Sequence, residues 1–263
     1  MFDVQSTSSK VNKLIVDDTD PVMAFVDEGT TPAEAAYTGT SVSAAVEKML
    51  GWISVTSEAL EDSEIDLAGH ILPKFANATA FRMDHIGISA SGAANSTDKG
   101  FSGVFYGGTL VTAAAGKNTV PELDEGDFLA CLLAVEASVL SKPGAGWIIH
   151  PRNLVRITEI KDGNGRAIFQ NALEAPSPGA IGRILGYPVY LCHAAPSTAA
   201  ASDRIAAFGD PMGMAVLLRK DLQMAVSEEA MFREDKTVFR ARARAAAVIK
   251  KATSWAVLRL AAS

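Results

Sequence analysis

Trp147-Ile-Ile-His150-Pro151-Arg152 opens an ordered run of short signatures in the second half of the chain. Lys161-Asp-Gly-Asn-Gly-Arg166, Leu185-Gly-Tyr-Pro188-Val189 and Phe208-Gly-Asp210 follow it in that order. Each of them alone indicates only a strand or a turn, because apolar β-branched runs favour strands and Asp-Gly or Asn-Gly pairs favour tight turns. Their order and spacing, taken together, decide the fold.

Extended runs dominate the chain beyond Gly146. We predict a short helix from Pro151 to about Ile160, and strands at residues 147–149, 187–191, 205–208, 214–218, 222–226 and 238–247. The sequence shows no internal repeat and no solenoid or coiled-coil period. Together with the helices expected nearer the N-terminus, these strands predict a mixed α+β fold.

A first helix is expected after residue 57, with Ser57 and Ser63 as candidate caps. Four apolar or small residues recur there at helical spacing, namely Leu67, Ile71, Phe75 and Ala78. Pro73 lies inside this pattern, so we expect a kink or a break near Leu72.

A second helix is expected from about Glu122 to Leu140. Thr119 and Glu122 have the spacing of a capping box at its start. One apolar stripe follows the helical period, formed by Phe128, Leu132, Val135 and Val139. The sequence Lys142-Pro-Gly-Ala-Gly146 ends the helix.

The first quarter of the chain lacks the apolar side chains of a core. Residues 1–20 are polar, which predicts an arm. Residues 24–56 contain two extended runs, Ala24–Val26 and Trp52–Thr56, separated by small and polar residues. A long β-hairpin fits this pattern best. Because its middle has few large apolar side chains, the hairpin must lie against another surface.

The net charge of −6 argues against tight nucleic-acid binding, because neutralising phosphates takes a clustered basic surface. The charges are nevertheless segregated along the chain. Residues 27–66 contain nine acidic side chains and one basic one, a net charge of −8; residues 233–251 contain seven basic and two acidic ones, a net charge of +5. Opposite poles favour a contact with a neighbouring copy as well as an internal one. Two ordinary solvated faces are the alternative.

The run Arg240-Ala-Arg242-Ala-Arg244 places its three guanidinium groups on one face of a strand, because side chains alternate between the two faces. One interpretation gives this row the carboxylates of a neighbouring subunit as partners; the other makes it a solvated edge strand protected by charge. The acidic counterpart is the cluster of Glu58, Glu61, Asp62, Glu64 and Asp66. Alternatively, part of that cluster complements the positive N-terminal end of its own helix. The candidate intersubunit contacts are therefore Asp27, Glu28, Glu58, Glu61, Asp62, Arg240, Arg242 and Arg244.

Signatures of catalysis, cofactors and metals are weak in this chain. Gly108–Lys117 lacks the Ser or Thr that completes a phosphate-binding loop, and no Gly-x-Ser-x-Gly nucleophile elbow occurs. The four histidines have no metal-ligand spacing, and Asp162–Gly165 indicates a tight turn rather than a calcium loop. An enzyme is the minority interpretation, and we expect no catalytic residue, cofactor or metal.

The remaining sequence features concern the compartment. Cys131 and Cys192 are expected to be unpaired thiols in a reducing environment. The start of the chain lacks the basic region and apolar core of a signal peptide. No uncharged apolar run approaches the roughly 18 residues that span a bilayer. We therefore expect synthesis and use in a cytoplasm, without a membrane.

In their order and spacing, the signatures from Trp147 to Asp210 closely resemble the axial domain of major capsid proteins of tailed bacteriophages, the Hong Kong phage capsid fold that encapsulin compartments share. Val26–Asp62 is similar to the extended loop of that family where it runs into the spine helix. Asp84–Phe101 looks like the glycine-rich loop after that helix, and Phe232–Arg240 like the long strand of the peripheral domain. The resemblance covers residues from about 24 to 258.

The resemblance implies an α+β subunit with an N-terminal arm (1–23), an extended β-hairpin loop (24–56) and an axial domain (121–212). Residues 57–120 and 213–263 would form the two parts of a peripheral domain with a long spine helix and long strands. Such subunits form pentamers and hexamers that tile an icosahedral shell. An arm and a hairpin that cannot bury themselves take their contacts from neighbours, so assembly would complete folding.

As a function, the resemblance implies the major capsid protein of a virion, assembled in the cytoplasm of a bacterial host around packaged double-stranded DNA that it does not bind sequence-specifically. A portal, a scaffold or protease, and a decoration protein are the further partners implied. An encapsulin-like nanocompartment is the alternative within the same fold. A soluble enzyme or binding module of mixed α+β fold is a third hypothesis.

Two features depart from the family pattern. Some members join subunits by an isopeptide bond between a lysine of the extended loop and an asparagine of the peripheral domain. Here Asp27–Glu47 contains no lysine and no asparagine follows Asn171, so that cross-link is not expected. Nothing like a long helical scaffold precedes Asp3, which fits a mature form, a shortened chain or a member with separate scaffolding.

Overall fold

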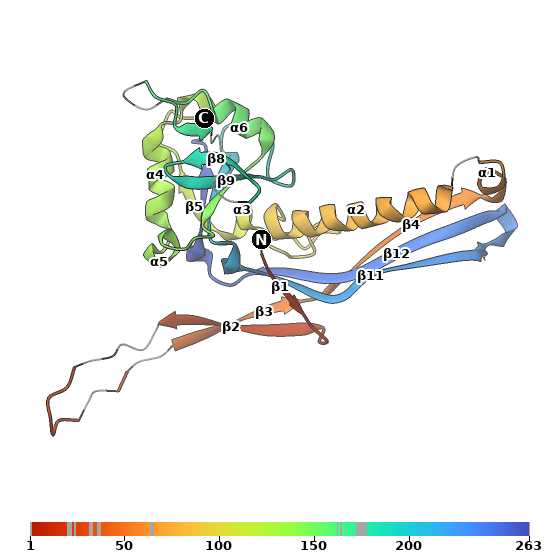
Figure 1. The fold of residues 1–263 in the computed structure, drawn as a ribbon, viewed down its shortest axis with the longest axis horizontal. Coiled ribbons are helices and arrows are strands. Elements are labelled where there is room, and N and C mark those ends of the chain that lie inside the picture. The colour runs from red at the N-terminus through yellow and green to blue at the C-terminus, as the bar shows by residue number, and fades with distance from the viewer. Residues whose placement is uncertain are drawn as a thin grey trace.

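The computed structural model describes residues 2–19, 23, 25–31, 34–35, 38–63, 66–161, 163, 165–171 and 178–262. Figure 1 shows an elongated molecule with three parts. A compact body carries the C-terminus, a long platform of one helix over several strands extends to one side, and a two-stranded hairpin projects to the other. Helices and strands are thus mixed, which confirms the predicted α+β class.

The compact body is built on a seven-stranded sheet of order β5-β13-β10-β6-β9-β8-β7. Its strands are β5 (Thr109–Thr112), β6 (Gly146–Ile149), β7 (Phe169–Asn171), β8 (Ala180–Ile184), β9 (Tyr187–Leu191), β10 (Arg204–Gly209) and β13 (Trp255–Arg259). The pairs β6–β9 and β5–β13 are parallel and the others are antiparallel. The strands predicted at 147–149, 187–191 and 205–208 are confirmed as β6, β9 and β10. Strands β5, β7, β8 and β13 were not predicted from the sequence.

Short helices cover this sheet: α3 (Val104–Gly107), η1 (Val120–Glu122), α4 (Glu125–Ala134), α5 (Ala137–Leu140) and α6 (Pro151–Ile157). The single helix predicted from Glu122 to Leu140 is wrong, because Val135 is extended, with ψ 150°, between α4 and α5. A second capping box, formed by Asp124 and Asp127, starts α4. The predicted apolar stripe does face the core, where the Phe128 ring lies 5.5 Å from that of Trp147.

The platform consists of a four-stranded sheet of order β1-β11-β12-β4 with a long helix on one face (Figure 1). Its elements are β1 (Asp3–Ser6), β4 (Glu47–Thr56), α1 (Ser57–Glu61), α2 (Leu67–Ile88), η2 (Pro211–Gly213), β11 (Met214–Met231), η3 (Phe232–Glu234), β12 (Lys236–Ile249) and η4 (Ala252–Ser254). The strands predicted at 214–218 and 222–226 are one continuous strand, β11. The strand predicted at 238–247 is confirmed within β12.

Helix α2 runs without interruption through Pro73, so the predicted break near Leu72 is wrong. The predicted caps also differ from the observed ones. The Asp66 carboxylate accepts a hydrogen bond from the Gly69 N–H at 2.9 Å and caps α2, in place of Ser63. Thr56, rather than Ser57, caps α1. Phe75 is buried against the sheet as expected, whereas Ala78 is exposed.

The projecting hairpin pairs β2 (Val11–Thr19) with β3 (Thr38–Ala45). The hairpin predicted between Ala24–Val26 and Trp52–Thr56 is therefore wrong; Trp52–Thr56 belongs to β4 and pairs with β12. Ala24 itself lies outside the described residues. The hairpin takes its first strand from the segment predicted as an arm, because Val11, Ile15 and their neighbours already have β propensity.

The first residues of the predicted arm also belong to the folded subunit. β1 pairs in parallel with the start of β11, and the Phe2 ring lies 6.4 Å from that of Trp255. The Lys250 ammonium group contacts the Asp3 carboxylate at 2.5 Å and lowers its pKa. A parallel edge strand of four residues thus anchors the N-terminus to the platform.

Candidate assembly surfaces

The arginine row lies in the middle of the platform sheet. Arg240 and Arg242 are exposed and Arg244 is half-buried, while the intervening Ala241, Ala243 and Ala245 are buried beneath α2. The predicted alternation is therefore confirmed. β12 has β11 on one side and β4 on the other, so the interpretation as a charged edge strand is wrong. The row is a surface on a sheet face.

Neighbouring strands extend this surface with two kinds of side chain. On β4, Lys48 lies opposite Arg244, Leu50 opposite Arg242 and Trp52 opposite Arg240. On β11, Lys220 lies opposite Arg244. The cationic face, as we name this surface, thus consists of Lys48, Leu50, Trp52, Lys220, Arg240, Arg242 and Arg244. Trp52 and Leu50 are 58% and 52% exposed, so the face offers apolar area beside its charges.

The cationic face has few partners within the subunit. The Arg242 Nε–H donates to the Gln223 side-chain oxygen at 3.0 Å. Within the described part of the chain, none of the three arginines forms an ion pair. Five positive charges gathered on one face of a protein with net charge −6 create a local field that favours an anionic partner.

The acidic candidates Asp27 and Glu28 lie in the turn at the end of the projecting hairpin. The Asp27 carbonyl accepts hydrogen bonds from the Thr30 N–H at 3.1 Å and from its hydroxyl at 2.7 Å, which shapes the turn. Both carboxylates are exposed, and the Phe25 side chain next to them is fully exposed. Figure 1 places this end of the hairpin on the opposite side of the body from α1.

The acidic candidates Glu58 and Glu61 lie on α1, at the far end of the platform, and Asp62 directly follows that helix; all three are exposed. Ser57 fixes this end, because its hydroxyl and N–H donate to the side chain and carbonyl of Asp235 at 2.8 and 3.0 Å. Glu58 occupies the first turn of α1, so the local interpretation of part of this cluster, at a helix N-terminus, is confirmed. Glu64 lies outside the described residues.

The structure therefore keeps the predicted acidic and basic residues apart within one subunit. Lys236 pairs with Thr56 at the α1 end, and Arg240 lies four residues farther along β12, roughly 13 Å at the rise of a strand. No ion pair between the arginine row and the five acidic candidates occurs among the described residues.

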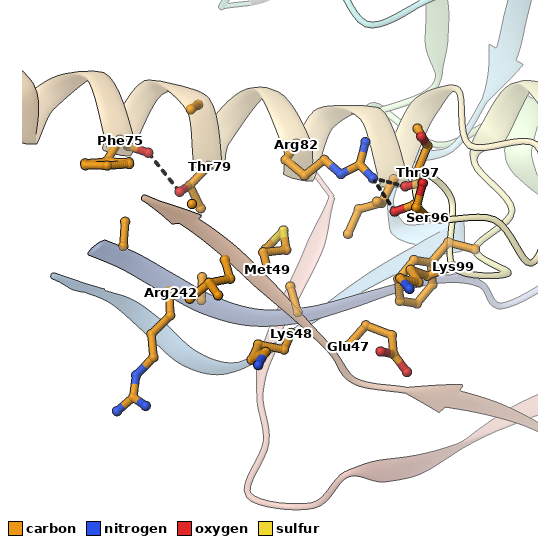
Figure 2. A pocket seen from close by; sticks show the side chains of 18 residues that line it. Glu47, Lys48, Met49, Phe75, Thr79, Arg82, Ser96, Thr97, Lys99 and Arg242 are labelled. Carbon is orange, nitrogen blue, oxygen red and sulfur yellow. Dashed lines mark hydrogen bonds between the residues drawn. The ribbon is translucent and has the colours of Figure 1, made fainter. Parts of the chain in front are cut away.

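A groove of about 380 Å³ lies on the other face of the sheet, beneath α2 (Figure 2). Small residues leave room for it: β12 lines it mainly with alanines, and β4 contributes Gly51 opposite Phe75. Arg82 lies at one end, where its guanidinium donates to the carbonyl oxygens of Ser96 and Thr97 (Figure 2). This contact ties α2 to the glycine-rich loop that follows it.

A buried carboxylate, which the sequence reading did not single out, organises that loop. Asp98 accepts hydrogen bonds from the Ser91 hydroxyl at 2.5 Å and from the Asn95 amide at 3.4 Å, and lies 2.8 Å from His85 Nε2. The Ser91 hydrogen bond is the largest cause that lowers the pKa of Asp98 to about 2. The Ser89 hydroxyl contacts the other ring nitrogen of His85, Nδ1, at 2.9 Å. The Asp98 carboxylate is thus fully used in contacts that hold the loop. The arrangement fastens residues 91–98 to the end of α2.

Groups suited to metal binding or redox chemistry are sparse. Across the described ranges, no group of three or more His, Cys, Asp or Glu side chains is placed to hold a metal ion. Cys131 and Cys192 are free, and burial raises the pKa of the Cys131 thiol to about 12. Of the helices in those ranges, none is long and apolar enough to cross a bilayer.

The subunit is elongated, with an exposed hairpin end and a cationic face whose arginines form no ion pair among the described residues. Residues 1–260 match the phage capsid family, and the chain belongs to that family. The predicted resemblance to phage major capsid proteins is thereby confirmed. A comparison with curated proteins found no match.

Solved structures show the same fold. The capsid of the native GTA particle aligns with a TM-score of 0.79 at 19% identity, over 99% of this chain and 88% of that one. The structure described as Mycobacterium phage Bobi aligns with a TM-score of 0.71 at 17% identity, over 100% and 89% of the two chains. The structure described as Mycobacterium phage Adephagia gives 0.70 at 13% identity, over 100% and 89%.

Proposed function

We propose that this chain is a major capsid protein whose copies form the pentamers and hexamers of an icosahedral phage head around packaged double-stranded DNA. Family membership over residues 1–260 carries the proposal. The exposed hairpin end supports it, because the Phe25 side chain beside Asp27 and Glu28 is fully exposed. The role is structural rather than catalytic, in a virion assembled in the bacterial cytoplasm with a portal, a scaffold or protease, and a decoration protein as further partners.

The parts of the subunit take their proposed roles from the fold. The compact body around residues 121–212 is the axial domain, with β5 and β13 completing its sheet. The platform corresponds to the peripheral domain expected at 57–120 and 213–263, without β5 and β13 and with β1 and β4 added, and the β2–β3 hairpin is the extended loop. Because β2 begins at Val11, the loop includes most of the segment first assigned to the arm.

In this proposal the cationic face receives acidic side chains of a neighbouring subunit. The hairpin end fits best, because Asp27 and Glu28 match the arginines while Phe25 matches the exposed Trp52 and Leu50. The second candidate set is formed by Glu58, Glu61 and Asp62 at the α1 end, and these three side chains would contribute charge but no apolar contact. Each contact is modest, and repetition around a closed shell makes the assembly stable.

Electron microscopy of the purified protein tests the proposal. Closed, regular shells are expected, and nucleic acid recovered from particles made during infection supports the phage head. Shells that hold a cargo protein and no genome would instead favour the encapsulin-like compartment. A monomer that persists at high concentration would refute both.

A further inference from the structure

The outer edge of β11 is open along most of its length. β1 pairs with Ala215–Leu218, and the last hydrogen bond on that side runs from the Thr7 N–H to the Leu218 carbonyl at 2.9 Å. From Arg219 to Met231, no described strand pairs with β11 on the side away from β12. Figure 1 shows this half of β11 along the free margin of the platform. Such an edge presents unpaired N–H and C=O groups to a further strand.

The open edge combines a regular centre with charged ends. Gln223–Ser227 pairs with β12 in unbroken register, whereas bulges interrupt the register on both sides of that stretch. Within it, Met224 and Val226 are 38% and 55% exposed. Bulges and charges are common protection for edges, yet these five central residues carry no charge and no proline.

The sequence of this edge is complementary to itself when two copies run antiparallel about Ala225. Gln223 then lies opposite Ser227, Met224 opposite Val226, and Ala225 opposite Ala225 of the second copy, so polar, apolar and small side chains each meet their own kind. At the ends, Lys220 lies diagonally across from Glu228 and Arg219 diagonally across from Glu229, while Asp221 lies directly opposite Glu229. Each end therefore brings together two diagonal pairs of opposite charge and one opposite pair of like charge.

The other open edge of the sheet, β4, lacks this symmetry. Its charges, Glu47 and Lys48, are adjacent at one end, and the other end, Ser54–Thr56, is uncharged. An antiparallel pairing of β4 with itself brings no opposite charges together at its ends. The charge pattern therefore favours a twofold contact through β11 over one through β4.

We propose that the free edge of β11 pairs with the same edge of a second copy across a local twofold axis through Ala225, joining two platform sheets into one. The partner is another copy of this chain rather than a different protein. This contact differs from the one between the hairpin end and the cationic face, since it uses backbone hydrogen bonds of a strand edge. It places a symmetric joint at the margin of the platform.

Disulfide trapping tests the register. Two Ala225→Cys residues on the axis would have Cα atoms about 4.5–5.5 Å apart, within the range of a disulfide. Ser227→Cys is the matched control, because its own counterpart would lie roughly 14 Å away at the rise of a strand. We expect oxidised Ala225→Cys protein to run as a dimer on non-reducing gels, both free and in particles, and Ser227→Cys to stay at the level of the wild-type chain with its two native cysteines. Dimers from both variants alike, or from neither, would overturn the twofold pairing.

Charge reversal tests the ends of the edge independently. Lys220→Glu or Glu228→Lys alone should reduce the Ala225→Cys dimer, and the two changes in one chain should restore it, because these two side chains are diagonal neighbours on one face of the proposed pairing. A loss without restoration contradicts the proposed antiparallel contact. If the wild-type chain forms no particles at all, the proposed capsid function fails, whereas Ala225→Cys dimers in solution still decide this inference.

Discussion

The triple substitution Arg240→Glu, Arg242→Glu and Arg244→Glu should block assembly while leaving the subunit folded. Within the described residues these arginines form no ion pair, and only Arg242 has a side-chain partner, Gln223. Loss of that hydrogen bond costs about 1 kcal/mol of unfolding free energy. Relief of repulsion from Lys48 and Lys220 offsets part of it. The thermal midpoint of the free subunit should therefore change little.

At the interface the effect is larger. Two exposed ion pairs, with Asp27 and Glu28, contribute ~0.2–1 kcal/mol each, so their loss costs ~0.4–2 kcal/mol per contact. Like-charge repulsion of similar size raises the total to ~1–4 kcal/mol, or roughly fivefold to a thousandfold in the association constant of each contact. Because every subunit of a shell makes this contact, the closed particle should be lost.

Light scattering and gel filtration at low and high salt measure the assembly, and circular dichroism measures the fold. The matched control replaces the same three arginines with lysine, which keeps the charge and should keep the particles. Asp27→Lys with Glu28→Lys, added to the triple glutamate variant, should restore assembly if the hairpin end is the partner. Normal particles from the triple glutamate variant would refute the electrostatic contact.

Three further predictions concern the fold. Asp98, whose pKa is about 2 when folded against an ordinary 3.8, contributes stability above pH 4 that is lost as pH falls toward 2; Asp98→Asn should flatten this acid limb in denaturant titrations, and an unchanged limb would contradict the role given to the carboxylate. Gly103→Ala should destabilise the subunit by more than about 1 kcal/mol in denaturant unfolding, because its Cβ would lie 2.4 Å from the Ile88 backbone; a neutral result would show that the loop has room. Phe128→Ala should cost about 3–5 kcal/mol of unfolding free energy, and a cost below that of an exposed Leu133→Ala would show that the body core is misassigned.

Strands in the compact body were predictable where apolar β-branched runs end in a turn. Gly146–Ile149 and Tyr187–Leu191 have that form, and the sequence located both. β13 was missed, because Trp255–Arg259 follows a short polar segment and has no turn signal after it. Its assignment depends on pairing with β10, which is distant in sequence.

The sequence predictions that proved wrong near the N-terminus have a related cause, because there too the pairing partner of a strand is distant in sequence. Trp52–Thr56 has the local pattern of a hairpin strand, but the long strand β12 offers it a ten-residue partner that the sequence cannot reveal. The uninterrupted helix through Pro73 shows tertiary packing overriding local preference, since Phe75 beyond the proline is buried against the sheet.

The candidate contacts were predictable in type and not in position. Alternation alone placed Arg240, Arg242 and Arg244 on one face, because strand geometry fixes that outcome. That this face lies at the centre of a sheet, with Trp52 and Leu50 beside it, required the pairing of β12 with β4. No sequence pattern marks Asp98, because its hydrogen-bond partners are residues common in any loop, and only the folded loop brings them to the carboxylate.

In the proposed shell, copies of this subunit bury one another's exposed surfaces. Electron microscopy and native mass measurement of the purified wild-type protein test it together with hydrogen exchange at the hairpin end. We expect hollow particles in the megadalton range, with residues 25–31 protected only in the particle. A monomer at high concentration, with the same exchange at that end under all conditions, would contradict it.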